Sequence, residues 1–167
     1  ALGYNYSVPL DKWHITDMAG DYIFVGNQDL DFEVPGTLGV IYNYKKWIKH
    51  KKGYPLLNIN NYLNEINLSE KLNIIYVFLE DLSSELFTKL KNDTTAVLII
   101  DTYNINGIAE QRKLFSELMN NNIKTPVIIR RRYKNLCDEQ LQLSASVDFG
   151  ALFLDGLGDG LLIVTEN

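Results

Sequence analysis

The segment most able to support chemistry holds three glycines and two aspartates within six residues: Asp155, Gly156, Gly158, Asp159 and Gly160. Backbone amides of such a turn can cradle a phosphate, and the two carboxylates could act as an acid–base pair or bind a metal. The glycine spacing fits neither a dinucleotide fingerprint nor a P-loop, and an apolar strand is expected where both motifs need a helix. We therefore interpret this glycine-rich turn as structural, with aspartates that accept hydrogen bonds from nearby backbone amides.

A second candidate is the basic run Arg130, Arg131 and Arg132, which directly follows the apolar residues 127–129. Ligand sites of parallel α/β folds lie outside the carboxyl ends of strands, and guanidinium groups match phosphate and carboxylate. A charge triplet is more often a solvated surface or an interface. We expect these arginines to make interface or solvent contacts, with an anion clamp as the alternative.

The sequence contains few thiol and imidazole groups. Cys137 is the only cysteine, and the two histidines, His14 and His50, are far from it and from each other. One thiol cannot form an internal disulfide, and it cannot hold an iron–sulfur cluster or a cysteine-rich zinc site. We expect Cys137 to be buried and inert, and the chain to contribute no catalytic, cofactor-binding or metal-binding residue.

Size and charge limit the class of protein. The chain has 167 residues, a net charge of −5 and a pI of about 5.0, which argues against general binding to nucleic acid or anionic membranes. The lysine-rich stretch around Trp47 is expected to be a solvated helix end whose tryptophan anchors the core. Neither a membrane span nor a signal peptide is predicted, so we expect a cytoplasmic location. Because the sequence starts without Met, we expect an internal fragment of a longer polypeptide.

Apolar runs rich in β-branched and aromatic residues predict the elements that position these side chains. Continuous apolar strands are typical of parallel sheets covered by helices, and the strand–helix alternation from residue 74 onward predicts right-handed crossovers. With no repeat or linker, residues 1–167 are expected to form one α/β domain. The predicted strands are 22–25, 38–42, 55–59, 74–79, 96–100, 127–129, 151–154 and 161–164, and the predicted helices are 82–90, 108–119 and 138–146.

The C-terminal part of the chain carries a family resemblance. The run FGALFLDGLGDGLL at residues 149–162 resembles a segment of the large-type 4-hydroxy-3-methylbut-2-enyl diphosphate synthases. The order of elements before it, a helix with QRKLFSEL at 111–118 and a strand with TPVII at 125–129, is similar to that family as well. The resemblance covers about residues 108–162.

The resemblance implies a role as the insert domain that separates the substrate-binding barrel from the iron–sulfur domain. It implies a TIM-barrel-like fold, and because eight-stranded barrels usually need about 200–250 residues, we expect an incomplete or degenerate barrel with mainly parallel strands. The parent enzyme would reductively open 2-C-methyl-D-erythritol 2,4-cyclodiphosphate, using a [4Fe-4S] cluster and electrons from ferredoxin or flavodoxin. No catalytic residue of the family matches a position here, so the fragment alone is predicted to be inactive.

Two other functions remain open at this point. A freestanding phosphate-binding α/β enzyme would use Arg130–Arg132 together with the glycine-rich turn, and it would lose anion binding on Arg131→Ala. A protein-interaction module would use the aromatic N-terminal third as its contact surface.

Overall fold

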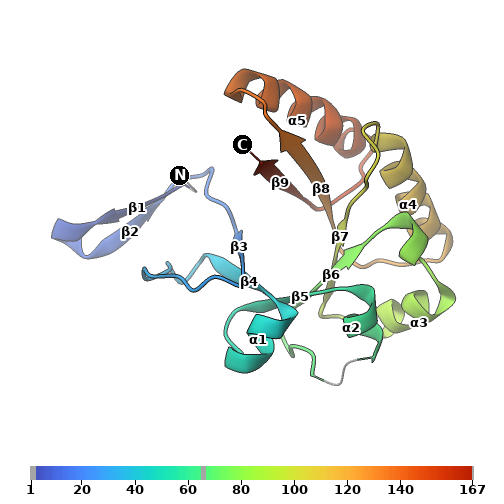
Figure 1. The fold of residues 1–167 in the computed structure, drawn as a ribbon, viewed down its shortest axis with the longest axis horizontal. Helices are drawn as coiled ribbons and strands as arrows, with labels where there is room; N and C mark the ends of the chain where they lie inside the picture. The colour runs from blue at the N-terminus through green and yellow to red at the C-terminus, as the bar shows by residue number, and fades with distance from the viewer. Residues whose placement is uncertain (1–2, 65–66, 167) are drawn as a thin grey trace. The chain divides into compact units, whose positions relative to one another are not determined.

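The computed structural model describes residues 3–64 and 67–166, and it has the expected α/β architecture. The chain divides into two compact units, Ala1–Leu56 and Leu57–Asn167. Figure 1 shows the elements of both units in chain order. Among the described residues, none of the helices combines the length and the apolar character needed to cross a membrane.

The first unit combines an antiparallel hairpin with parallel strands. The hairpin pairs Tyr6 with Trp13, and the centres of their rings lie 5.2 Å apart. It was not predicted from the sequence, because its apolar residues alternate with polar ones and form no continuous apolar run. The parallel strands follow in chain order, β3-β4-β5. The elements are β1 (Tyr4–Ser7), the 3-10 turn η1 (Val8–Leu10), β2 (Lys12–Ile15), β3 (Tyr22–Gly26), β4 (Gly39–Asn43), α1 (Tyr44–His50) and β5 (Tyr54–Leu57).

Helix α1 confirms the interpretation of the lysine-rich stretch. Tyr44 and Trp47 are buried one turn apart on the same side of the helix, while the lysines are more exposed. The indole Nε1 of Trp47 donates a hydrogen bond of 3.1 Å to the carbonyl of Gly53, and the ammonium of Lys51 lies 4.4 Å from the indole ring centre. Trp47 therefore anchors this helix in its unit.

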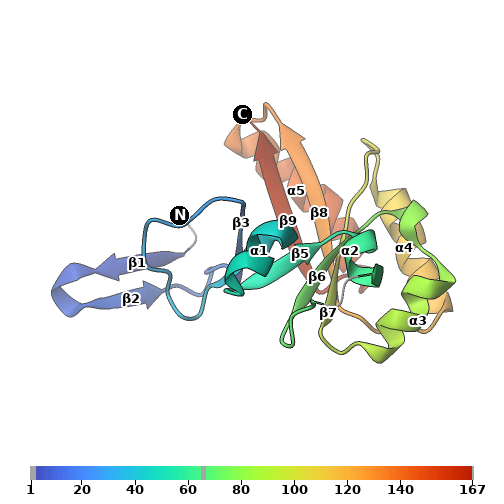
Figure 2. The ribbon, with the colours of Figure 1, turned by 60° about the horizontal axis from the view of Figure 1, so that its bottom comes forward.

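The second unit is a parallel sheet with helices between its strands. Its strand order is β6-β7-β8-β9, so each strand pairs with the one that precedes it in this part of the chain. Figure 2 shows the strand and helix alternation from another side. The elements are α2 (Ile59–Asn64), β6 (Asn73–Val77), the 3-10 turn η2 (Leu79–Asp81), α3 (Ser84–Asn92), β7 (Ala96–Ile100), α4 (Ile108–Asn120), β8 (Val127–Lys134), α5 (Asp138–Phe153) and β9 (Gly160–Glu166).

Apolar stripes on the helices and apolar side chains of the strands form the core of the second unit. Helices α3, α4 and α5 lie on the same side of the sheet (Figure 1). The Ser83 hydroxyl accepts a hydrogen bond of 3.2 Å from the Leu86 amide and so fixes the start of α3. The most deeply buried apolar side chains of this unit are Leu57, Tyr62, Ile74, Ile75, Val77, Leu86, Leu98, Ile100, Leu114, Ile129 and Leu152.

The expected barrel-like class is confirmed. In the described residues, seven parallel strands run in chain order, three in the first unit and four in the second, with helices in the connections. Sequential parallel strands joined by helices are the building pattern of a TIM barrel, which has eight. The fold therefore resembles an incomplete TIM barrel.

Three predicted elements differ from the structure in type or by many residues in length. Residues 151–153 of the expected strand 151–154 belong to the end of α5, which continues past residue 146 to Phe153. The run is apolar enough for a strand, but Phe149 and Leu152 are buried at helical spacing, and short apolar runs do not distinguish the two states. Strand β8 continues through the arginines to Lys134, because ion pairs on both faces satisfy the charges.

Candidate functional site

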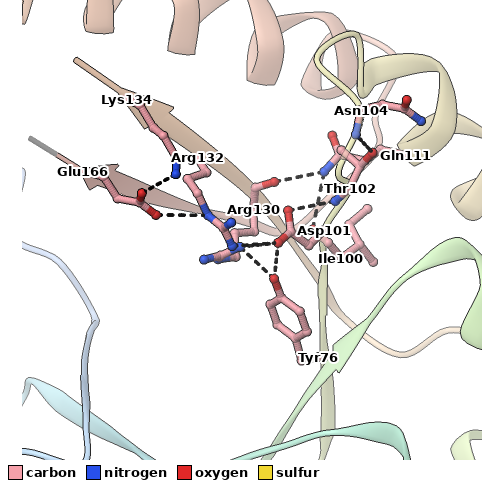
Figure 3. A network of polar contacts seen from close by, with 10 residues as sticks. All are labelled: Tyr76, Ile100, Asp101, Thr102, Asn104, Gln111, Arg130, Arg132, Lys134 and Glu166. Atoms are coloured by element: carbon pink, nitrogen blue, oxygen red, sulfur yellow. Dashed lines mark hydrogen bonds and ion pairs between the residues drawn. The ribbon is translucent and has the colours of Figure 1, made fainter. Parts of the chain in front are cut away.

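Strand β8 sends its basic side chains to opposite faces of the sheet. Arg131 and Tyr133 point to the face covered by α5, whereas Arg130, Arg132 and Lys134 point to the other face, as alternation along a strand requires. The second set lies at the carboxyl end of the strand, where parallel α/β folds place their sites (Figure 3). We call Arg130, Arg132 and Lys134 the basic triad.

Arg131 serves the fold. Its Nε donates to the Asp148 carboxylate of α5 at 3.0 Å, and its Nη2 donates to the Ile105 carbonyl at 2.9 Å. The Tyr133 hydroxyl donates to the same Asp148 carboxylate at 2.9 Å. Only 8% of Arg131 is exposed, so this guanidinium fastens α5 and the loop after β7 to the strand and is withdrawn from ligands.

Arg130 forms a buried polar cluster with Asp101 and Tyr76. Its Nη1 donates to the Asp101 carboxylate and, at 2.7 Å, to the Tyr76 hydroxyl, which in turn donates to Asp101. The guanidinium also lies 5.3 Å from the centre of the Tyr76 ring. Burial and then the hydrogen bond to Asp101 raise the pKa of Tyr76 above its usual range, so the phenol is neutral at physiological pH.

Backbone groups and one glutamine hold this cluster in place. The Thr102 amide donates to Asp101 at 2.8 Å. Gln111 of α4 is 1% exposed, and its Nε2 donates to the carbonyls of Arg130 at 3.1 Å and Ile100 at 3.4 Å, which links the helix to two strands. Within the described part of the chain, the Oε1 of Gln111 has no hydrogen-bond partner.

Arg132 and Lys134 are held more loosely than Arg130. The closest contacts of the Arg132 guanidinium are ion pairs of 3.8 Å to Asp101 and 3.6 Å to Glu166, both longer than a hydrogen bond. Lys134 contacts Glu166 at 2.6 Å. This hydrogen bond holds the pKa of Glu166 below its usual range, so the carboxylate stays ionised at neutral pH.

An aromatic row adjoins the cluster. The Tyr76 and Phe78 rings meet edge to face with centres 5.2 Å apart, and Phe78 stacks on Tyr103 at 4.6 Å. Tyr103 lies in the loop after β7 and is 76% exposed. This side of the unit therefore combines exposed positive charge with an accessible aromatic ring.

The glycine-rich turn lies at the other end of the strands. The turn connects α5 to β9, whereas it was predicted to connect two strands. Gly160 pairs with Ile128 at the start of β8, and Val164, four residues further along β9, pairs with Arg132. The Asp159 carboxylate accepts a hydrogen bond of 2.8 Å from the Val127 amide, and its own amide donates to the Val127 carbonyl at 2.8 Å. The arginines and the turn therefore do not form one site.

Two positions in the turn differ in surroundings. Gly156 and Gly158 have φ of +72° and +95°, but only Gly158 is enclosed: a Cβ there would lie 2.7 Å from Cδ1 of Ile129. Asp155 forms an ion pair with Arg112 of α4, and each of the two side chains is half-exposed to solvent. These contacts favour the structural interpretation of the turn.

Thiol and imidazole groups stay apart. Cys137 is exposed at the start of α5, and the expectation of a buried thiol was wrong because the residue sits in the turn between β8 and α5. His14 lies in β2 and His50 at the end of α1. Among residues 3–64 and 67–166, no cluster of three His, Cys, Asp or Glu side chains could hold a metal ion. With one cysteine, the chain does not fit a [4Fe-4S] cluster.

Sequence comparison connects this geometry to known proteins. The chain is 30% identical over 147 residues to 4-hydroxy-3-methylbut-2-en-1-yl diphosphate synthase (flavodoxin) of Parabacteroides distasonis, which covers 88% of this chain. It is 26% identical over 148 residues to the protein of the same name from Phocaeicola vulgatus, and 33% identical over 106 residues, 64% of this chain, to that from Porphyromonas gingivalis. The chain belongs to this synthase family. The resemblance seen in the glycine-rich tail is thereby confirmed.

The match to the synthases is partial from their side. The chain spans about 24% of the length of the Parabacteroides and Phocaeicola synthases, and 18% of the Porphyromonas synthase. No family model matches the chain, and no solved structure is similar enough to be recognised. The family is thus identified from similarity to longer synthases, and this chain corresponds to one segment of each of them.

Proposed function

We propose that this chain is an internal structural domain of a 4-hydroxy-3-methylbut-2-en-1-yl diphosphate synthase, which spaces the substrate-binding barrel from the iron–sulfur domain. The observation that carries the proposal is the asymmetry of the match: 88% of this chain aligns with only 24% of the Parabacteroides synthase. A compact fold aligned over almost its whole length to a quarter of a larger enzyme is what an internal domain produces.

The chemistry of the described residues supports an architectural role. Arg131 and Asp159 are used by the fold, and the neutral Tyr76 is a poor general base because burial opposes its ionisation. The parent enzyme would open 2-C-methyl-D-erythritol 2,4-cyclodiphosphate reductively, with electrons from flavodoxin or ferredoxin. In that enzyme the [4Fe-4S] cluster would be bound by cysteines of another domain, since this chain has one.

The freestanding phosphate-binding enzyme receives less support. That function requires Arg130–Arg132 and the glycine-rich turn in one site, but the pairing of Ile128 with Gly160 and of Arg132 with Val164 sets them at opposite ends of β8 and β9. Arg131, its proposed anion ligand, is bound to Asp148.

The test uses the intact synthase that contains this chain. Replacing residues 1–167 by a short flexible linker should abolish turnover, while the cluster absorbance and the binding of the cyclic diphosphate to the barrel should persist. Arg112→Gln, which changes an exposed ion pair with Asp155 and a hydrogen bond to the Ala151 carbonyl, serves as a control and should leave the rate unchanged. Retained turnover after the deletion, or turnover by residues 1–167 alone, would refute the structural role.

A further inference from the structure

The face of the sheet that bears the basic triad has unbalanced charge. The triad contributes three positive charges, and only two carboxylates, Asp101 and Glu166, contact it among the described residues. Asp101 is 4% exposed and is already occupied by Arg130, Tyr76 and the Thr102 amide. One positive charge at the carboxyl end of the strands is therefore left without a close counter-charge in this part of the chain.

That charge is centred on Arg132. Its guanidinium is 37% exposed, and both of its ion pairs, at 3.6 and 3.8 Å, exceed hydrogen-bond distance. No hydrogen bond joins it to the described residues, so its planar set of N–H donors is available. Such a set binds two oxygens of a phosphate at once, which a lysine cannot do.

The neighbours of Arg132 suit an oxyanion as well. Arg130 is fixed beneath it by the Asp101 and Tyr76 contacts and uses only Nη1 in the hydrogen bonds described. Lys134 is 62% exposed, and its partner Glu166 is a half-exposed carboxylate that can turn into solvent. An incoming dianion would replace Glu166 on Lys134 and Arg132, so that the carboxylate acts as a competitor for the same positive charges.

We propose that Arg132, together with Lys134 and Arg130, forms a binding site for a phosphate group at the carboxyl ends of β8 and β9. The site is independent of the spacing role proposed above and of the glycine-rich turn. The ligand is inorganic phosphate, pyrophosphate or the phosphate of a small molecule. Phe78 and Tyr103, stacked beside Tyr76, offer an apolar wall for the rest of a phosphate ester.

The experiment measures hydrogen exchange in β8 and β9 of the intact protein, together with calorimetric titration, using inorganic phosphate, pyrophosphate and glycerol phosphate. Sodium chloride at matched ionic strength controls for charge screening. We expect saturable protection of both strands with at least one of the three phosphates. Arg132→Gln should weaken this component at least about tenfold, because it removes a two-point charged contact.

Matched variants separate a specific site from general electrostatics. The exposed pair Arg112–Asp155 lies in the same unit and does not touch the triad. Arg112→Gln therefore changes the net charge as Arg132→Gln does, and Asp155→Asn changes it as Glu166→Gln does. Glu166→Gln should tighten phosphate binding about threefold or more by removing the competitor, whereas Asp155→Asn should not. The proposal is overturned if none of the three phosphates protects β8 and β9, if Arg132→Gln binds like the unaltered protein, or if the control variants behave like the triad variants.

Discussion

Gly158 and Gly156 offer a paired test of how the glycine-rich turn stabilises the second unit. Both have positive φ, but an added Cβ at Gly156 meets no heavy atom within 4 Å, whereas one at Gly158 would lie 2.7 Å from Cδ1 and 3.1 Å from Cγ1 of Ile129. Ile129 is fully buried in β8, so any shift of its side chain must be taken up by closely packed neighbours. We therefore expect Gly158→Ala to be clearly more destabilising than Gly156→Ala.

The magnitude follows from two separate terms. An alanine at positive φ costs about 1 kcal/mol, and this term applies to both variants. Overpacking of a filled core adds about 1–3 kcal/mol, and this term applies only to Gly158→Ala. The expected losses of unfolding free energy are about 1 kcal/mol for Gly156→Ala and about 2–4 kcal/mol for Gly158→Ala.

The assay can separate the two compact units. Both tryptophans, Trp13 and Trp47, lie in the unit Ala1–Leu56, so tryptophan fluorescence during urea unfolding reports on that unit. Hydrogen exchange of β8 and β9 amides reports on the unit that contains the turn. The loss should appear in the exchange of β8 and β9. Equal losses for the two variants, or a more stable Gly158→Ala protein, would refute the packing argument.

Three further predictions test the contacts of Asp159, of Arg131 and of the buried tyrosines. Asp159→Ala should cost about 1–3 kcal/mol in urea unfolding, because the buried Val127 amide loses its acceptor, whereas Asp155→Ala should stay within about 0.5 kcal/mol; similar losses would contradict the assigned roles. Arg131→Gln should cost about 2–4 kcal/mol by the same measurement, because it leaves the Asp148 carboxylate without its cation, and a loss below about 1 kcal/mol would contradict this. In a spectroscopic alkaline titration of the ten tyrosines, three should ionise well above pH 10 or only on unfolding, since burial and hydrogen bonds to aspartate raise their pKa values; early ionisation of all ten would contradict it. These three are Tyr62, Tyr76 and Tyr133.

The sign of this pH effect follows from the folded state. A raised phenol pKa means that the fold favours the neutral form, so the associated stability is fully present below pH 10 and is lost as the pH rises through the folded pKa. Asp93 behaves in the opposite sense. Burial raises its pKa, but hydrogen bonds from Thr95 and Tyr62 outweigh burial and lower it overall, so its contribution is lost as the pH falls.

Strand β7, which is buried on both faces, could be predicted from the sequence because every residue in it is apolar. The strand predicted at residues 96–100 has the same limits as β7. The same criterion failed at residues 151–154, where an equally apolar run is helical. It also ended β8 too early, since charges at Arg130–Lys134 look like a loop until their partners are known.

The candidate site was predictable only in part. The arginine run was recognised, but its division between two faces depends on β8 continuing through it. Asp101 could have been noticed as an acidic residue directly after a buried strand. Tyr76, Gln111 and Glu166 gave no signal, because each acquires its role through contacts with residues at least 11 positions away.

Neighbouring arginines of the run point to opposite faces of the sheet, so the fold is sensitive to the number of residues that precede β8. If one residue were deleted in the segment before the strand while the sheet pairing was kept, each side chain would take the place of the preceding one. Arg132 would then face Asp148 in place of Arg131, and Arg130 would enter the fully buried position of Ile129. A length change that alters no charge would thus bury one cation at a position that now holds an apolar side chain. Natural relatives should therefore tolerate exchanges at Arg132 more readily than gaps between α4 and β8.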